Sequence, residues 1–360
     1  MSTVHVIVPS GLDDPSRPSG GNTYDRRVCG GLAGLGWTVR ELRVAGTWPR
    51  ADGPSRAALS ARLADVPADA VVLVDGLVAS AAHEVLVPEA KRLRLVVLVH
   101  LPLGVDPPPG GRPSAAEGDA RSSECAALHA AAAVVVTSRW TRGWLVATYH
   151  VAPDRVFVVP PGVDPAEVVP GGATGARVVC VGAVTPTKGQ DLLVEALAGV
   201  ADLGWAGTCV GSTHPDPPFA ARVRRRAEAV GVGDRLRFTG PRVGRDLAAV
   251  YAAADLVVAP SRTETYGMVV TEALARGIPV VGAEVGGLPE ALGKTADGRL
   301  PGILVPPGDA APLADALRRW LTDVGLRDDL RRAARERRAT LPGWDVTAER
   351  LSTVLSEVAA

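Results

Sequence analysis

The sequence predicts an α/β protein made of two doubly wound domains that face each other across a cleft. Its 360 residues are enough for about two domains, each with a sizeable core. Short Val-rich runs ending in Gly, Pro or Ser alternate with helical patterns along the whole chain. These runs are apolar on both faces, which is typical of parallel strands covered by helices on both sides of a sheet.

The predicted strands form two series, one for each domain. The first series is expected at Val4–Val8, Ala70–Val74, Leu95–Val99, Val134–Thr137 and Val156–Val159. The second is expected at Val178–Val181, Gly207–Val210, Leu236–Thr239, Leu256–Ala259, Pro279–Gly282 and Ile303–Val305. Between them, Pro160–Ala176 is rich in Pro, Gly and small residues without periodicity, as in an interdomain linker. We therefore expect an N-terminal domain at 1–165 and a C-terminal domain at 166–342.

The end of the chain is predicted to be helical. Amphipathic patterns indicate helices at Pro312–Leu321 and Leu326–Leu341, with Asp309 as the N-cap of the first. Residues 343–360 are expected to form a further helix that packs back on the N-terminal domain. Ligands of doubly wound sheets bind at the carboxyl ends of the strands, so functional residues are expected on the loops that follow them.

Composition argues against several classes of protein. The formal net charge is +0, whereas a nucleic-acid-binding protein would normally carry a basic half or stripe. No window approaches the ~20 apolar residues of a membrane span, and Met1–Pro9 lacks the basic start of a secretory signal, so a cytoplasmic location is expected. The four cysteines are far apart and form no CxxC pair, which argues against a zinc site or a disulfide framework.

The densest set of candidate residues follows the predicted strand Leu256–Ala259. A loop containing Glu264 leads to a helix that carries Glu272, and both carboxylates are expected to face one cleft. Gly267 lies at the expected helix start, where the amides of Gly267, Met268, Val269 and Val270, together with the helix dipole, suit a phosphate. Glu272 is then placed to accept two hydrogen bonds from a vicinal diol such as a ribose.

The segment PSRTETYGMVVTEALARGIPVVGAEVGGLPEAL resembles the C-terminal signature of the retaining GT-B glycosyltransferases of family 4, also called glycosyl transferases group 1. VGAVTPTKGQDLL upstream and GILVPPGD downstream match further segments of that family, and the resemblance covers about residues 155 to 325. It implies two Rossmann-like domains. It also implies transfer of a sugar from a nucleoside-diphosphate donor, most commonly a UDP-sugar, to a hydroxyl acceptor with retention of configuration and without a metal or other cofactor.

The resemblance also implies roles for particular residues of the C-terminal domain. Glu264 would contact the donor sugar, Glu272 the ribose, and Lys188 the diphosphate, with Tyr266 also at the donor site. The family's Arg before that Lys is replaced by Ala183, so the sequence leaves open whether Arg262, Arg242 or an N-domain Arg supplies the charge. We place Arg242 among the donor-binding candidates.

The N-terminal half resembles the family more loosely. Gly20 and Gly21 follow the first strand, where the family's Gly-rich loop reaches the donor phosphates; a plain flexible turn is the alternative. His100 ends the strand Leu95–Val99, where the family often has a His that contacts the donor sugar, and we assign it to catalysis with Lys188 and Glu264. Asn22, His100 and Trp140 are the acceptor-binding candidates, although Trp140 and Trp144 have the i, i+4 spacing of core aromatics.

Other functions and partners remain open at this point. A nucleotide-sugar epimerase, or a binding protein without catalysis, is compatible with the same architecture. The run Arg222 to Arg226 suits a solvated helix face better than an anionic lipid, and a small hydroxylated metabolite or natural product is preferred as acceptor over a membrane lipid. Donor base, sugar, acceptor and oligomeric state are not determined by the sequence.

Overall fold

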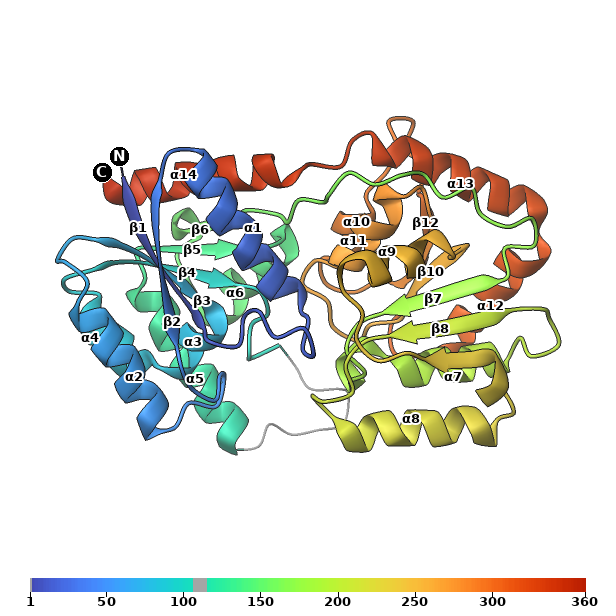
Figure 1. Cartoon of the computed structure of the whole chain (residues 1–360), viewed down its shortest axis with the longest axis horizontal. Coiled ribbons are helices and arrows are strands. Elements are labelled where there is room, and N and C mark those ends of the chain that lie inside the picture. The colour runs from blue at the N-terminus through green and yellow to red at the C-terminus, as the bar shows by residue number, and fades with distance from the viewer. Residues whose placement is uncertain (1, 106–114) are drawn as a thin grey trace. The chain divides into compact units, whose positions relative to one another are not determined.

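The computed structural model describes residues 2–105 and 115–360 (Figure 1). The chain divides into two compact units. Unit 1 comprises Met1–Asp13, Gly20–Gly162 and Trp344–Ala360, and unit 2 comprises Asp14–Ser19 and Val163–Gly343. Each unit contains one parallel sheet with helices, so the predicted two-domain α/β class is confirmed.

Unit 1 is built on a six-stranded parallel sheet in the order β2-β1-β3-β4-β5-β6. Its strands are β1 (Thr3–Pro9), β2 (Thr38–Val44), β3 (Val71–Asp75), β4 (Arg94–Val99), β5 (Ala133–Val136) and β6 (Val156–Val158). Its α-helices are α1 (Gly20–Gly34), α2 (Gly53–Ala64), α3 (Gly76–Ala81), α4 (His83–Glu89), α5 (Ala115–Ala130), α6 (Arg139–Tyr149) and α14 (Trp344–Ala359).

The sequence analysis missed strand β2. Its sequence, TVRELRV, carries three charged residues, Arg40, Glu41 and Arg43, and only Val44 is fully buried. The strand lies at the edge of the sheet and pairs with β1 alone, so it does not need the doubly apolar pattern used to find the others.

The final helix, α14, packs against α1 within unit 1. A Cβ added to Gly31 of α1 would lie 2.5 Å from the Cβ of Ala348, so the glycine allows the two helices to approach closely. The Trp37 indole donates to the Ser352 hydroxyl at 2.8 Å, which ties the end of this helix pair to the sheet.

Unit 2 contains the second six-stranded parallel sheet, in the order β12-β11-β10-β7-β8-β9. Its strands are β7 (Arg177–Val181), β8 (Ala206–Val210), β9 (Leu236–Phe238), β10 (Leu256–Ala259), β11 (Val280–Ala283) and β12 (Gly302–Val305). Its α-helices are α7 (Gln190–Ala198), α8 (Pro217–Ala229), α9 (Gly244–Ala252), α10 (Met268–Ala275), α11 (Leu288–Leu292), α12 (Ala310–Thr322) and α13 (Val324–Arg338). Asp309 caps α12 as predicted, accepting from the amide of Ala311 at 2.9 Å.

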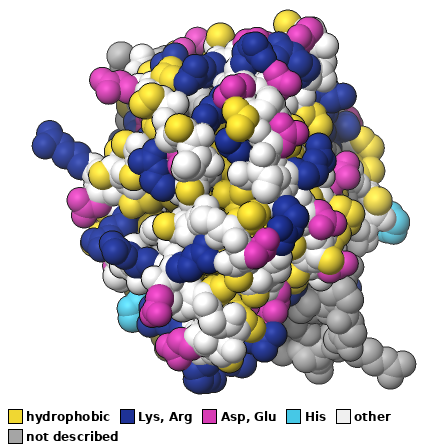
Figure 2. Space-filling view, turned by 90° about the vertical axis from the view of Figure 1, so that its right-hand side faces the viewer, with side chains coloured by type: hydrophobic (Ala, Val, Ile, Leu, Met, Phe, Trp, Pro, Cys, Tyr) yellow, Lys and Arg dark blue, Asp and Glu magenta, His cyan; other side chains and the backbone are white. Residues whose placement is uncertain are grey.

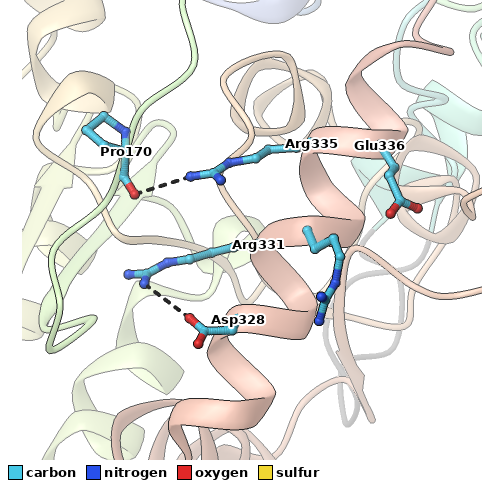
Figure 3. A pocket seen from close by; sticks show the side chains of 6 residues that line it. Pro170, Asp328, Arg331, Arg335 and Glu336 are labelled. Atoms are coloured by element: carbon cyan, nitrogen blue, oxygen red, sulfur yellow. Dashed lines mark hydrogen bonds and ion pairs between the residues drawn. The ribbon is translucent and has the colours of Figure 1, made fainter.

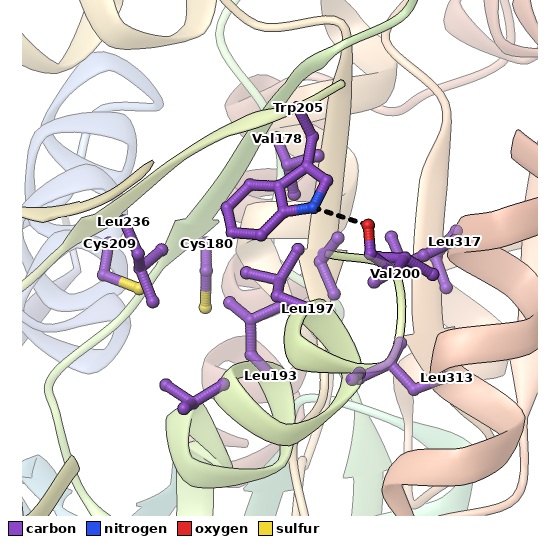
Figure 4. Close-up of a cluster of buried hydrophobic side chains, with 14 of the residues drawn as sticks. Val178, Cys180, Leu193, Leu197, Val200, Trp205, Cys209, Leu236, Leu313 and Leu317 are labelled. Carbon is purple, nitrogen blue, oxygen red and sulfur yellow. Dashed lines mark hydrogen bonds between the residues drawn. The ribbon is translucent and has the colours of Figure 1, made fainter. Parts of the chain in front are cut away.

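One apolar cluster of unit 2 fills the space between β7, β8 and helices α7 and α12 (Figure 4). Cys180 and Cys209 are register partners on β7 and β8, and both are buried, free thiols. Trp205 is also buried and donates its indole N–H to the Val200 carbonyl at 3.0 Å, which satisfies the one polar atom of the ring.

The predicted linker runs beside α13 (Figure 1). Residues 159–176 form neither helix nor strand. Four arginines of α13 donate to its carbonyls: Arg338 to Ala166 at 2.6 Å, Arg335 to Pro170 at 3.4 Å, Arg331 to Gly172 at 2.6 Å and Arg327 to Ala173 at 3.5 Å. The arginines of α13 therefore partly fix this segment.

Among the described residues, no helix combines the length and apolar character needed to cross a membrane. On the face drawn in Figure 2, basic and acidic side chains are interspersed, in keeping with the formal net charge of +0. Arg222, Arg224, Arg225 and Arg226 are exposed on α8, and Arg226 forms an ion pair with Glu195 at 2.5 Å. These arginines thus lie on a solvated helix face, which the sequence analysis preferred over a lipid-binding surface.

Candidate functional site

Strands β7 and β10 mark the place in unit 2 where a ligand is expected. They are neighbours in the sheet, but the chain continues from β7 toward β8 on one side and from β10 toward β11 on the other. At such a switch point the loops after the two strands diverge and leave a crevice at their carboxyl ends. Lys188 follows β7 and Glu264 follows β10, so the topology brings these two predicted residues to one place.

Backbone contacts join the two loops. The amide of Arg262 donates to the Thr187 carbonyl at 2.7 Å, and its guanidinium donates to the Pro186 carbonyl at 2.9 Å. Gly189 has φ +69, and a Cβ there would lie 2.1 Å from the carbonyl oxygen of Pro260. The glycine after Lys188 is thus required by this close approach of the loop after β10.

Lys188 and Glu264 form an ion pair at the centre of the site. The Lys188 Nζ lies 2.6 Å from Glu264 Oε2, and the side chains are 33% and 11% exposed. Ser261 Oγ donates more weakly to the same oxygen, at 3.4 Å. The cation expected at the diphosphate and the carboxylate expected at the sugar are therefore each other's partners in the structure.

The backbone of Glu264 is held by the Gly286–Gly287 pair. The amide of Gly287 donates to the Glu264 carbonyl at 2.9 Å. Gly286 has φ +58, and a Cβ there would lie 1.8 Å from that same carbonyl oxygen. These glycines support the loop that presents Glu264.

Gly286→Ala is therefore expected to disturb the Glu264 loop. The added Cβ meets backbone rather than a movable side chain, and the left-handed φ adds strain, so we expect a loss of about 1–3 kcal/mol in the free energy of unfolding. Urea denaturation measures this loss. The control is Gly298→Ala, which has φ +88 but nothing within 4 Å of its Cβ, so an equal loss in both variants would contradict the contact argument.

The start of α10 provides backbone donors beside this ion pair. Gly267 is the N-cap with φ +98, and its ideal Cβ position lies 3.5 Å from Glu264 Cγ. In the part of the chain that the structure describes, the amides of Gly267, Met268 and Val269 find no hydrogen-bond acceptor, whereas that of Val270 donates to the Gly267 carbonyl at 2.9 Å. Three of the four expected amides are thus available, and the expectation for Val270 was wrong because the first turn closes on itself.

Glu272 lies farther along α10. Its Oε2 accepts from the Tyr251 hydroxyl at 2.7 Å, and burial raises the pKa of its carboxyl group, opposed by Tyr251 and by the charge of Arg276. The carboxylate keeps a second oxygen for a ligand, as an interaction with a ribose diol requires.

The remaining residues of unit 2 that were considered for binding the sugar donor differ in their surroundings. Tyr266 is 7% exposed and belongs to an apolar cluster, so its ring packs inside the unit. Arg242 is exposed, with Asp246 at 3.9 Å. Arg262, considered as a substitute for the cation absent at Ala183, makes a bidentate ion pair with Asp191 at 2.7 Å for both bonds. Its charge is thereby already paired.

In unit 1, the predicted glycines and His100 lie together. Gly20 and Gly21 form the first turn of α1, so the flexible-turn alternative was wrong. A Cβ on Gly21 would lie 3.0 Å from His100 Cδ2, so the glycine makes room for the imidazole. His100 directly follows β4. Asn22, also on α1, and Trp140, at the start of α6, are both half-buried.

Sequence reasoning missed two carboxylates at His100. The Nε2 atom of His100 lies 2.9 Å from Asp25 Oδ1 and 3.7 Å from Asp75 Oδ2. Asp75 ends the apolar strand β3, a position that signals a functional residue, whereas Asp25 lies in the helical pattern of α1 and carries no such signal.

A cavity of about 630 Å³ lies beside α13, lined by Pro170, Asp328, Arg331, Arg332, Arg335 and Glu336 (Figure 3). Arg331 and Arg335 extend across it toward the linker segment, where their guanidinium groups donate to backbone carbonyls. Because these donors already have acceptors, we assign the cavity to support of the linker rather than to a substrate.

Comparison with known proteins identifies both halves of the chain. A family model described as glycosyl transferases group 1 matches residues 172–337, and one described as glycosyltransferase family 4 matches residues 3–167. The D-inositol 3-phosphate glycosyltransferase of Salinispora tropica is 36% identical over 251 residues, which cover 63% of this chain and 51% of that protein. The chain spans about half the length of the curated relatives it matches.

Solved structures show the same architecture. The sucrose-phosphate synthase from Thermosynechococcus elongatus has a TM-score of 0.77 at 24% identity and is matched over 99% of both chains. Anabaena HepE in complex with UDP-glucose has a TM-score of 0.78 at 19% identity, over 99% of this chain and 100% of that one. These likenesses show a two-domain GT-B fold, and with both halves matched by family models the chain belongs to the family 4, or group 1, glycosyltransferases.

Proposed function

We propose that this protein transfers a sugar from a nucleoside-diphosphate donor, preferably a UDP-sugar, to a hydroxyl group of a small-molecule acceptor, with retention of anomeric configuration and without a metal. Unit 2 binds the donor and unit 1 the acceptor. The observation that carries the proposal is the convergence of Lys188, Glu264 and the unpaired amides at the start of α10 on one crevice. A cytoplasmic location is part of the same proposal.

The chemistry follows from charge development on the leaving group. As the bond to the sugar breaks, negative charge grows on the diphosphate, where Lys188 and the amides of Gly267, Met268 and Val269 stabilise it without a metal. When Lys188 turns to the diphosphate, Glu264 loses its partner and its oxygens accept hydrogen bonds from the sugar hydroxyls. His100, in unit 1, is the further residue that we propose for catalysis.

The choice of donor rests on analogy, supported by one solved complex. HepE, which shares the fold, was solved with UDP-glucose. UDP-sugars are also common donors among the family 4 glycosyltransferases. The interspersed surface charge and the D-inositol 3-phosphate glycosyltransferases among the relatives favour a small polyhydroxylated acceptor.

Glu272→Gln tests the expected ribose contact. A charged acceptor bonded to a diol contributes about 1.5–3 kcal/mol, so we expect the variant to bind UDP about tenfold or more weakly. The variant should bind 2′-deoxy-UDP no more weakly than the wild type does. Calorimetric titration measures both, and an equal loss for the two nucleotides would contradict a ribose contact. Since burial raises the pKa of Glu272, wild-type UDP affinity should also fall on acidification before an ordinary carboxyl would be protonated.

The function itself is tested by a donor screen. Thermal stabilisation by UDP, GDP and ADP identifies the base, since ligand binding stabilises the folded state by mass action. The matching sugar nucleotides are then incubated with small polyols and metabolites, with EDTA present. We expect release of the nucleoside diphosphate together with a glycoside of the donor's own anomeric configuration. Epimerised donor without an acceptor, or binding with neither transfer nor hydrolysis, would contradict the proposal.

A further inference from the structure

Asp25, Asp75 and His100 form a buried group at the switch point of the unit 1 sheet. Asp25 lies on the helix after β1, Asp75 ends β3 and His100 follows β4; β1 and β4 flank β3 in the sheet (Figure 1). The chain leaves β1 and β3 in opposite directions, so their carboxyl ends meet the condition for a ligand crevice. The group therefore lies where unit 1 is expected to meet its substrate.

Charge is unbalanced in this group. Asp25 and Asp75 are 2% and 5% exposed, and within residues 2–105 and 115–360 neither forms an ion pair with a lysine or arginine. Asp75 Oδ1 accepts from the amides of Leu77 and Val78 at 2.8 and 3.4 Å, which leaves Oδ2 toward His100. Asp25 Oδ2 is buried and has no hydrogen-bond partner in the described part of the chain. Two buried carboxylates thus share one basic side chain.

We propose that Asp25 and Asp75 are positioning residues that keep His100 doubly protonated, with its Nε2–H directed at their carboxylates. The imidazole then meets the substrate as a cationic hydrogen-bond donor for an oxygen of the sugar or of a phosphate. The role of His100 in catalysis rests on the proposed function, whereas the double protonation of its ring does not.

The electrostatics agree with this geometry. Burial acts to lower the pKa of His100, but the charge and hydrogen bond of Asp25 and the charge of Asp75 outweigh it, so the pKa of His100 is raised. Burial and the nearby Asp25 charge raise the pKa of Asp75 to about 7. Among the described residues, Tyr24 of α1 is a further titratable group at the ring. Its ring lies edge-on at 5.2 Å, and burial raises its own pKa, so it stays neutral.

The first test needs no substrate. Nitrogen-15 labelling of the six histidines, with His100→Gln for assignment, follows the His100 ring nitrogens from pH 5 to 9. We expect both nitrogens to remain protonated at pH values above the ordinary histidine pKa of about 6.5, and the proton to be lost as the pH rises through the raised pKa. Titration of His100 at or below the ordinary pKa would overturn the proposal.

The second test separates positioning from mere packing. Asp25→Asn should lower the His100 pKa by about one unit or more and move the alkaline limb of the kcat profile to lower pH by the same amount. The control is Asp65→Asn, an exposed carboxylate of the same unit, which should leave both unchanged. The affinity for UDP should stay within about threefold in both variants, because we assign UDP binding to unit 2.

The outcomes separate the two proposals. A loss of activity in Asp25→Asn without any shift of the His100 pKa would refute the positioning role. Failure of all variants and the wild type to bind UDP would refute the proposed function instead.

Discussion

Lys188→Ala is expected to lower the rate of sugar transfer about 10²-fold and to weaken UDP binding in parallel. Removing one preorganised donor from a site of developing negative charge typically costs 10²–10³ in rate. We take the lower end because Lys188 is one-third exposed and solvent screens its charge. The loss should be severe for a single residue, because Arg262 is already paired with Asp191 and Ala183 supplies no charge.

The measurement is a steady-state assay with matched UDP titrations. Lys294→Ala provides the control, since Lys294 is an exposed lysine of the same unit and one of only three in the chain. Both variants should unfold at the same urea concentration as the wild type. If Lys188→Ala kept wild-type transfer and UDP affinity, the leaving group would have to be stabilised elsewhere.

Glu264→Gln should change binding and transfer in opposite directions. The carboxylate is the partner of Lys188 at 2.6 Å, so its negative charge competes with the diphosphate for the same ammonium group. Neutralising it should tighten free UDP binding several-fold, because a partly exposed ion pair is worth about 1 kcal/mol or less. Transfer should nevertheless fall about 10²-fold, since the amide replaces a charged acceptor for the sugar hydroxyls during bond cleavage.

Comparison with Glu272→Gln makes this result diagnostic. That variant removes a carboxylate from the same helix region but is expected to weaken UDP binding, so the two substitutions should move affinity in opposite directions. An exposed carboxylate, Glu284, provides a neutral reference as Glu284→Gln. If Glu264→Gln weakened UDP binding as Glu272→Gln does, Glu264 would contact the nucleotide rather than compete with it.

The fold was predictable because its strands are buried on both faces. Doubly apolar runs revealed five of the six strands of unit 1 and all six of unit 2 within a few residues. The edge strand β2 was missed because charged residues interrupt the apolar pattern on both of its faces. Residues 343–360 were expected to return to the N-terminal domain, and α14 does pack in unit 1, where Gly31 allows the close approach of Ala348.

The part of the candidate site that lies on a single strand–loop–helix segment was predictable from the sequence. The placement of Gly267 at the start of α10 follows from local turn chemistry, and it was predicted correctly. The Lys188–Glu264 pair was not, because contacts between residues 76 positions apart depend on side-chain direction. Asp25 was missed for the same reason: it meets His100 across 75 positions, and a charged residue inside a helix gives no sign of being buried.

The most direct test of the account uses the amide of Met268. Only Met1 and Met268 are methionines, so [15N]methionine labelling, with Met268→Leu for assignment, gives a single reporter at the first residue of α10. We predict that UDP shifts the Met268 amide resonance, that uridine leaves it in place, and that Lys188→Ala reduces the shift at equal UDP concentration. A wild-type protein that binds UDP with no change at Met268, or with the same change for uridine, would contradict diphosphate binding at this helix.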